Sequence, residues 1–234
     1  LVALPSALRL WLVRGGSAGL GGAQTIYVAQ PAISPSVGTS GDLDGDGDDD
    51  LIVGASALPG ALWSLPSDGH GSFGPGAARA TVGAPQALAT GDWNGDGALD
   101  VVAAATAANL TAIHLGANGA LGAAQPIAGG ANPVDLAAAD VTGDGLLDVV
   151  VVNASANQVR VLPGLGNGGF AAAITIGVGA GTSPQAVAVG DVDGDGQPEL
   201  VVANAGAGGS LTLVRRTTTG FSVAAPSAIG GPAA

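Results

Sequence analysis

The sequence contains no cysteine, no lysine and no long apolar run. Without cysteine the chain can form neither disulfides nor thiolate metal sites, an absence that neither proves nor excludes secretion. No apolar run reaches the roughly 18 residues that a membrane-spanning helix needs. All six basic residues are arginines, and they form no basic patch of the kind that binds nucleic acid. We therefore expect no membrane span and no nucleic-acid partner.

Residues that commonly carry catalysis are also scarce. The chain has two histidines: His70 stands in a glycine-rich turn, and His114 stands on an alternating strand, where we expect it to be half-exposed. No phosphate-binding loop and no HExxH motif occurs. Acidic pairs, which a glycosidase would need, occur only within the acidic loops described next. We therefore expect no catalytic residues, no bound organic cofactor and no enzymatic activity.

The acidic residues are concentrated in a nine-residue loop that occurs four times. Loops one to four span residues 42–50, 92–100, 140–148 and 191–199. They hold 16 of the 18 acidic residues, and only Asp68 and Asp135 lie outside them. Carboxylates gathered so closely repel one another unless a cation lies among them. The net charge of −12 therefore indicates metal sites, and four divalent ions would reduce it to −4.

Each loop offers hard oxygen ligands at alternate positions. Positions 1, 3, 5 and 9 carry oxygen-bearing side chains, position 7 offers a backbone carbonyl, and glycine at positions 4 and 6 lets the chain curl around an ion. About six or seven such oxygens suit Ca²⁺ better than Mg²⁺, and no His or Cys lies nearby to favour zinc or copper. The predicted ligands are Asp42, Asp44, Asp46, Asp48 and Asp50; Asp92, Asn94, Asp96, Ala98 and Asp100; Asp140, Thr142, Asp144, Leu146 and Asp148; and Asp191, Asp193, Asp195, Gln197 and Glu199, of which Asp48, Ala98, Leu146 and Gln197 would contribute carbonyl oxygens.

Two other interpretations explain the loops less well. Asp-Gly runs can simply form turns, but four copies with an acid at positions 1, 5 and 9 favour a metal. An EF-hand needs Glu at position 12 and flanking helices, whereas position 12 here is Val or Ala and the flanks are strand-like. We expect about four calcium ions, and the weakest binding in loop three, where Thr142 removes one carboxylate.

The segments around each loop predict four short strands per repeat. A strand of small apolar residues precedes the loop, a buried-type strand such as 149–152 follows it, and an alternating third strand such as 159–161 comes next. A glycine-rich turn then leads to a fourth strand that opens on an apolar residue. These residues are Leu20, Phe73, Leu121, Phe170 and Phe221. Four antiparallel strands per roughly 50 residues are typical of a propeller blade.

The predicted fold is therefore all-β, a β-propeller of four-stranded antiparallel blades with the metal loop between the first and second strand. The chain 1–234 is interpreted as one domain of about five blades, approximately 1–36 (incomplete), 37–86, 87–134, 135–185 and 186–234. It begins with Leu1 and shows no signal peptide, which we interpret as a mature or excised piece. Two explanations of the incomplete blade stay open: the chain is a five-blade ring whose missing strand was cut out or is supplied by another segment, or it is part of a longer array.

Aromatic and basic residues outside the ligand positions give weaker signals. Trp11 and Trp63 occupy equivalent third-strand positions, where packing between blades is favoured over stacking on sugars. Trp93, at position 2 of loop two, is expected in the core. Arg215 and Arg216 form a small basic spot that we expect at a solvated edge.

The motif resembles the FG-GAP repeat. The pattern Asp-x-(Asp/Asn)-Gly-Asp-Gly-x-x-Asp, followed by an apolar strand and a Phe-Gly or Gly-Phe turn, is similar to that repeat, to the VCBS-type repeats of bacterial surface proteins and to the propeller of integrin α-subunits. The resemblance implies calcium in the loop between the first and second strand. It also implies a mostly extracellular family with roles in adhesion, in glycan binding or as accessory domains of secreted enzymes.

These observations predict a secreted or cell-surface calcium-binding β-propeller that serves as a binding or adhesion module, with structural Ca²⁺. Its partners would be a protein or glycan ligand on a cell surface, or neighbouring copies of itself. Two alternatives stay open. The chain could be a structural subunit of a surface assembly or filament whose incomplete blade is completed by a neighbour, or a non-catalytic accessory region of a secreted polysaccharide-active enzyme.

Overall fold

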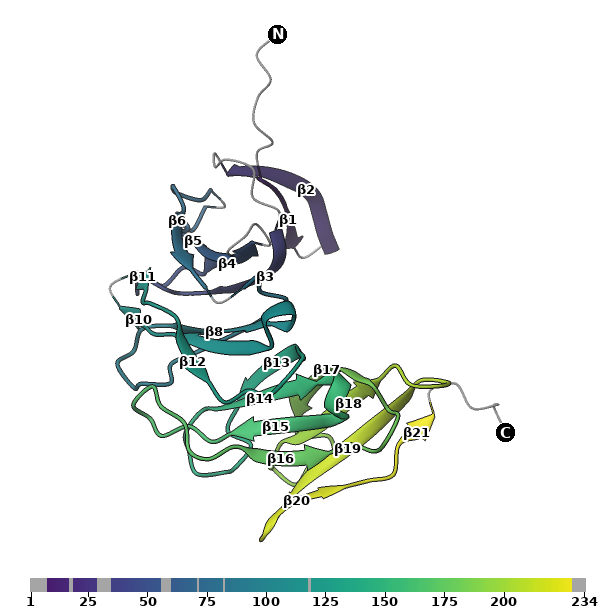
Figure 1. The fold of residues 1–234 in the computed structure, drawn as a ribbon. Helices are drawn as coiled ribbons and strands as arrows, with labels where there is room; N and C mark the ends of the chain where they lie inside the picture. Colours follow the sequence, from purple (N-terminus) through teal and green to yellow (C-terminus); the bar gives the residue numbers. More distant parts are fainter. Residues whose placement is uncertain are drawn as a thin grey trace.

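The computed structural model describes residues 8–16, 19–28, 35–55, 60–70, 72–81, 83–117 and 119–228. Four antiparallel sheets follow one another along the chain, after a two-stranded hairpin of β1 (Leu8–Gly16) and β2 (Gly19–Val28). Figure 1 shows the sheets stacked along an arc, with the hairpin at the N-terminal end. We call the four sheets blades one to four.

Each blade uses its strands in sequence order. Blade one comprises β3 (Pro35–Gly41), β4 (Asp50–Ala55), β5 (Ala61–Leu65) and β6 (Ala77–Ala80); blade two β7 (Ala87–Gly91), β8 (Asp100–Ala105), β9 (Leu110–His114) and β12 (Gln125–Ile127); blade three β13 (Pro133–Ala139), β14 (Asp148–Asn153), β15 (Gln158–Leu162) and β16 (Ile174–Gly177); and blade four β17 (Pro184–Gly190), β18 (Glu199–Asn204), β19 (Ser210–Thr217) and β20 (Gly220–Val223). Short elements complete the chain: β10 (Gly116–Ala117), β11 (Ala120–Leu121), β21 (Ser227–Ala228) and the 3-10 turns η1 (Thr106–Ala108) and η2 (Ala154–Ala156). Every acidic loop joins the first strand of a blade to its second strand, as predicted.

The second strand of blade three is buried on both faces because a blade packs on each side. All six residues of β14 are buried. Val149 and Val151 belong to a core that includes Val102 of blade two, whereas Val150 and Val152 belong to a core shared with blade four. Alternate residues of a strand point to opposite faces, so one strand serves two cores. The prediction of a buried second strand is confirmed.

The first strands of successive blades lie side by side and form the inner edge of the arc. β3 contacts β7, β7 contacts β13, and β13 contacts β17 (Figure 1). One of these joints includes a hydrogen bond: Asp135 on β13 accepts the backbone N–H of Val187 on β17 at 2.9 Å. Within the described part of the chain, no further blade lies beyond β17 in the same way.

The exposed fraction of the side chain at position 2 of each loop shows whether a following blade covers that position. Leu43, Trp93 and Val141 are 3%, 1% and 0% exposed, whereas Val192 in loop four is 54% exposed. The Trp93 ring lies 6.5 Å from the ring of Phe170 in blade three, tilted by 58°. The prediction that Trp93 lies in the core is confirmed, and position 2 is a residue of the joint between blades.

The fourth strands begin later than predicted in blades one to three. Their predicted opening residues lie before β6, β12 and β16, in small hairpins where Phe73 pairs with Ser67, Leu121 with Gly116 and Phe170 with Gly164. In β2 and β20 the predicted residues Leu20 and Phe221 do lie within the fourth strand. The acidic loops explain this difference, because in blades one to three the last acid of the loop binds the backbone of the small hairpin in its own blade.

The expectation that His114 is half-exposed is wrong, because its side chain is fully buried. Its Nδ1 lies 3.0 Å from the carbonyl oxygen of Gly122, and its Nε2 lies 3.2 Å from the hydroxyl of Thr81, which follows the last strand of blade one. A carbonyl can only accept, so Nδ1 carries the proton and Nε2 accepts from Thr81. His114 is a neutral polar contact between two blades.

Val141→Ala and Val192→Ala make the same chemical change at the same loop position in two environments. Removing buried methyl groups at Val141 should lower the free energy of unfolding by about 1–3 kcal/mol. The change at exposed Val192 should stay within about 0.5 kcal/mol. Urea unfolding of both variants measures this, and equal losses would contradict the arrangement of the joints.

Burial lowers the pKa of His114 below its ordinary value of 6.5, against the opposing hydrogen bond to Gly122. The unfolded chain therefore takes up this proton at a higher pH than the folded chain. The stability that neutral His114 contributes is fully present above the unfolded pKa. It is lost as pH falls below about 6.5, by at most ~1.4 kcal/mol per pH unit. His114→Asn should flatten the dependence of the unfolding free energy on pH between pH 7 and 5.5. Identical slopes for wild type and His114→Asn would refute this.

Candidate metal centres

The first carboxylate of each loop organises the backbone around itself. In loop one Asp42 Oδ1 accepts the N–H of Gly45 at 2.7 Å, and Oδ2 accepts the N–H of Gly47 at 3.0 Å. Both glycines have positive φ, 81° and 91°, a conformation that is strained for residues with a Cβ. Asp92, Asp140 and Asp191 accept the corresponding pairs of N–H groups. All four loops therefore follow one backbone path.

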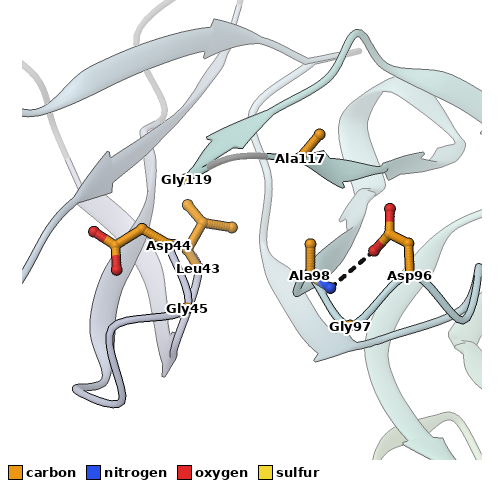
Figure 2. A pocket seen from close by; sticks show the side chains of 8 residues that line it. All are labelled: Leu43, Asp44, Gly45, Asp96, Gly97, Ala98, Ala117 and Gly119. Carbon is orange, nitrogen blue, oxygen red and sulfur yellow. Dashed lines mark hydrogen bonds between the residues drawn. The ribbon is translucent and has the colours of Figure 1, made fainter.

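The acid at position 5 forms a second local contact. In every loop it accepts the backbone N–H of position 7, at 2.8 to 2.9 Å. The pairs are Asp46 with Asp48, Asp96 with Ala98, Asp144 with Leu146, and Asp195 with Gln197. Figure 2 shows this bond between Asp96 and Ala98. These four carboxylates are exposed, so they remain accessible to a cation.

The acid at position 9 is buried and connects the loop to a distant turn of its own blade. Asp100, fully buried, accepts the N–H of Trp93 on Oδ2 at 2.9 Å and the N–H of Gly116 on Oδ1 at 2.7 Å. Asp50 binds Leu43 and Ser67 in the same way, and Asp148 binds Val141 and Gly164. These bonds draw the end of the third strand toward the loop, which explains why the small hairpins leave the main sheet.

Loop four departs from this arrangement. Glu199 accepts the N–H of Val192 at 3.0 Å. The residue at the register position of Gly116 and Gly164 is Arg216, which pairs with Phe221 and so continues β19 directly into β20. The sequence interpretation treated position 9 only as a ligand and missed its second role. The available signal was a small residue, Ser or Gly, two positions after the third strand in blades one to three.

Two of the four loops bring three carboxylates together. Oxygen atoms of Asp42, Asp44 and Asp50 lie within 4.8 Å of one another, and so do those of Asp191, Asp193 and Glu199. No other group of three acidic, His or Cys side chains lies this close in the described residues. Position 3 makes the difference, because loops two and three have Asn94 and Thr142 there. Asn94 donates to Asp96 at 3.0 Å.

The electrostatics of the loops follow from this geometry. In loop one desolvation, and then the charges of Asp50 and Asp46, raise the pKa of Asp44. Burial raises the pKa of Asp100 and of Asp148, although their N–H donors oppose it. In loop four the N–H groups of Gly196 and Gly194 lower the pKa of Asp191. The convergent groups are negatively charged oxygens only, the donor set of a hard cation such as Ca²⁺. The residues of loops one and four fit this ion.

The two adjacent arginines contact the loops. Arg215 Nε lies 3.1 Å from Asp193 Oδ2. Arg216 donates to the carbonyl oxygen of Thr142 and to the side-chain oxygen of Gln197, both at 2.7 Å. The expectation of a solvated edge is therefore wrong for Arg216, which is half-buried and links loop three to loop four.

Neighbouring loops enclose a shallow pocket of about 320 Å³ between blades one and two. It is lined by Leu43, Asp44, Gly45, Asp96, Gly97, Ala98, Ala117 and Gly119. Figure 2 shows that the carboxylate of Asp44 points away from blade two, whereas the carboxylate of Asp96 turns toward Ala98 of its own loop. A Cβ on Gly119 would lie 2.8 Å from the Cβ of Asp44, so the turn of blade two packs closely on loop one. The two loops are thus separate sites joined by a blade contact.

Comparison with known proteins agrees with this geometry. A sequence profile described as FG-GAP-like repeat matches residues 42–103, 92–151 and 140–202. These matches span more than half of the chain, so the chain belongs to the FG-GAP-like repeat family. No curated protein sequence matches it.

A solved structure shows the same fold. It is described as the crystal structure of BBS1N in complex with ARL6DN, soaked with lead, and it is similar to this chain with a TM-score of 0.54 and 16% identity. The alignment covers 80% of this chain and 55% of that one. The chain is therefore a β-propeller of four-stranded antiparallel blades. Among the described residues, no helix has the length and apolar character to cross a membrane.

Asp100→Asn and Asp96→Asn make one chemical change at a buried and an exposed position of the same loop. At position 100 the substitution replaces one carboxylate oxygen, an acceptor, by an NH2 group. This donor would face a backbone N–H. In chelator it should lower the free energy of unfolding by about 1–3 kcal/mol. Asp96→Asn should cost less than about 0.5 kcal/mol under the same conditions. Urea unfolding in EGTA measures both, and equal effects would contradict a metal-independent role for Asp100.

Proposed function

We propose that this chain is an extracellular calcium-binding β-propeller that serves as a binding or adhesion module, with Ca²⁺ in a structural role. The observation that carries the proposal is the convergence of three carboxylates in loop one and again in loop four, within 4.8 Å. Bound calcium would supply the positive charge and the oxygen coordination that hold such carboxylates together. Loops two and three follow the same path with fewer charges, so they are weaker sites in this proposal.

The position of the loops supports a structural role for the ion. Position 9 of loop one is tied to the turn after β5 through Ser67. Position 3 of the same loop packs against Gly119 of blade two. An ion at loop one would therefore stiffen both its own blade and the joint to the next one.

The proposal gives the chain no catalytic role. His114 is buried between blades, bonded to Gly122 and Thr81. The two groups of three acidic residues, in loops one and four, are assigned to calcium in this proposal and not to catalysis. These contacts support a binding module, and the family and fold support one that binds proteins.

The packing of Trp63 favours a protein ligand over a glycan. Trp63 lies against Val53 and Leu65, both 1% exposed, and Phe73. A ring packed in this cluster is not a free stacking platform for a sugar. Trp11, the tryptophan at the equivalent third-strand position, lies where no side chain is described. An outside location accords with calcium sites, because the low calcium concentration of the cytosol would leave them empty.

Thermal unfolding combined with light scattering, in Ca²⁺ and in EGTA, tests the proposal. Calcium should raise the melting temperature, since binding only to the folded state stabilises it by about 2.7 kcal/mol per site at a hundredfold excess over Kd. Asp44→Asn should reduce this shift. Asp49→Asn is the matched control, because it removes the same charge from the same exposed loop outside the three-acid group.

Either of two results would overturn the calcium sites. One is a melting temperature that does not respond to calcium. The other is an equal loss of the calcium shift in Asp44→Asn and Asp49→Asn, which would indicate general charge screening rather than a site.

A further inference from the structure

Loops two and three carry the same number of carboxylates but differ at position 3. Each has three acids, at positions 1, 5 and 9. In loop two the side-chain oxygen of Asn94 accepts the backbone N–H of Asp96 at 2.9 Å. Asp44 in loop one and Asp193 in loop four accept the N–H of position 5 in the same way, at 3.2 and 3.3 Å. In these three loops a side-chain oxygen of position 3 therefore lies beside position 5.

The side chain of Thr142 in loop three does not take this place. The N–H of Asp144 donates to Asp140 at 3.1 Å instead, and the N–H of Thr142 itself donates to the buried Asp148 at 2.9 Å. The hydroxyl oxygen of Thr142 is buried, whereas the acids at the same position of loops one and four are exposed. Loop three therefore lacks an accessible side-chain oxygen at position 3.

A guanidinium lies against positions 3 and 4 of loop three. Arg216 of blade four donates through Nη1 to the carbonyl oxygen of Thr142 and through Nη2 to the side-chain oxygen of Gln197, both at 2.7 Å. A Cβ on Gly143, at position 4, would overlap the guanidinium, so the two groups are packed closely. Because an arginine keeps its charge at every ordinary pH, loop three has a permanent positive charge beside it.

The contacts that the other loops receive from a following blade are neutral. On loop one, blade two packs Gly119 against Asp44. On loop two, blade three donates the N–H of Gly168 to the carbonyl oxygen of Trp93 at 2.9 Å. Among the hydrogen bonds and ion pairs of the described blades, Arg216 is the one charged group that a following blade brings to the preceding loop. A positive charge in this position lowers the affinity of the loop for a divalent cation.

We infer that the guanidinium of Arg216 takes the place of a metal ion at loop three, and that this loop binds no calcium where the other three loops do. The residues of loop three do not fit the ion, because one ligand is missing and a positive charge lies beside the loop. Hydrogen bonds within the loop and from blade four close its turn instead. The inference rests on the proposed calcium sites and goes beyond them, since loop three becomes a joint without an ion rather than a weak site.

Counting the bound calcium tests this inference on the unmodified chain. Equilibrium dialysis of the metal-free protein against calcium should give about three ions per chain, one each in loops one, two and four. Asp96→Ala in loop two and Asp144→Ala in loop three remove the same ligand from position 5, where both acids are exposed. Asp96→Ala should remove one ion, and Asp144→Ala should remove none.

The outcomes separate this inference from the proposed function. Equal effects of Asp96→Ala and Asp144→Ala would overturn the inference, whether both remove an ion or neither does. An ion that is lost in Asp144→Ala would show that loop three binds calcium beside Arg216, and the calcium sites of the other loops would still stand. A chain that binds no calcium at all would overturn the proposed calcium sites, and this inference with them.

Restoring the missing ligand shows whether the arginine keeps calcium out. In a chain carrying Thr142→Asp, a further Arg216→Gln removes the positive charge, whereas Arg216→Lys keeps it. The Gln variant should bind an additional ion about tenfold more tightly than the Lys variant. Equal affinities would overturn the role given to the guanidinium. Melting in EGTA checks that both variants fold, and the count on the unmodified chain decides the inference if either does not.

Discussion

A sheet with two apolar faces must be covered on both sides, and the arrangement of this chain depends on that requirement. Val149 to Val152 supply two cores from one strand, with all four side chains fully buried. Burying one valine is worth about 1.5–3 kcal/mol, so a blade separated from its neighbours would lose much of what holds it together. The blades are therefore stable as a series, and a blade without a following neighbour, like blade four, exposes the residues that the series would bury.

The acidic loops make the same joints specific. A buried carboxylate that accepts two N–H groups fixes the loop within its own blade, and with it the side chain at position 2 that the loop presents to the next blade. Asp100 does this by joining Trp93 to Gly116. The raised pKa of Asp100 shows the cost of burying the charge, and the two donors offset part of it. Trp93 is itself a residue of the joint, so the carboxylate connects loop, turn and neighbouring blade in one network.

Local patterns in the sequence predicted most of the fold. The order of the strands, the glycine positions of the loops and the burial of the second strands of blades two and three depend on residues close in sequence, and the structure confirms them. The burial of His114 and the bridge made by Arg216 were not predictable in this way, because Thr81 and Thr142 lie in other blades. The sequence identified all four loops, and the structure adds that three carboxylates converge in loops one and four.

The loops also show why a metal site and a turn need not be alternatives. Asp42 uses both oxygens to accept N–H groups, so the loop is shaped by its own hydrogen bonds, and each oxygen keeps a further lone pair. A site already folded in this way loses little conformational freedom when an ion binds. Loop three lacks a carboxylate at position 3. There the guanidinium of Arg216 lies against the carbonyl oxygen of Thr142. In loop three an arginine of the next blade thus brings positive charge to the joint, whereas in loops one and four the proposed cation would bring it.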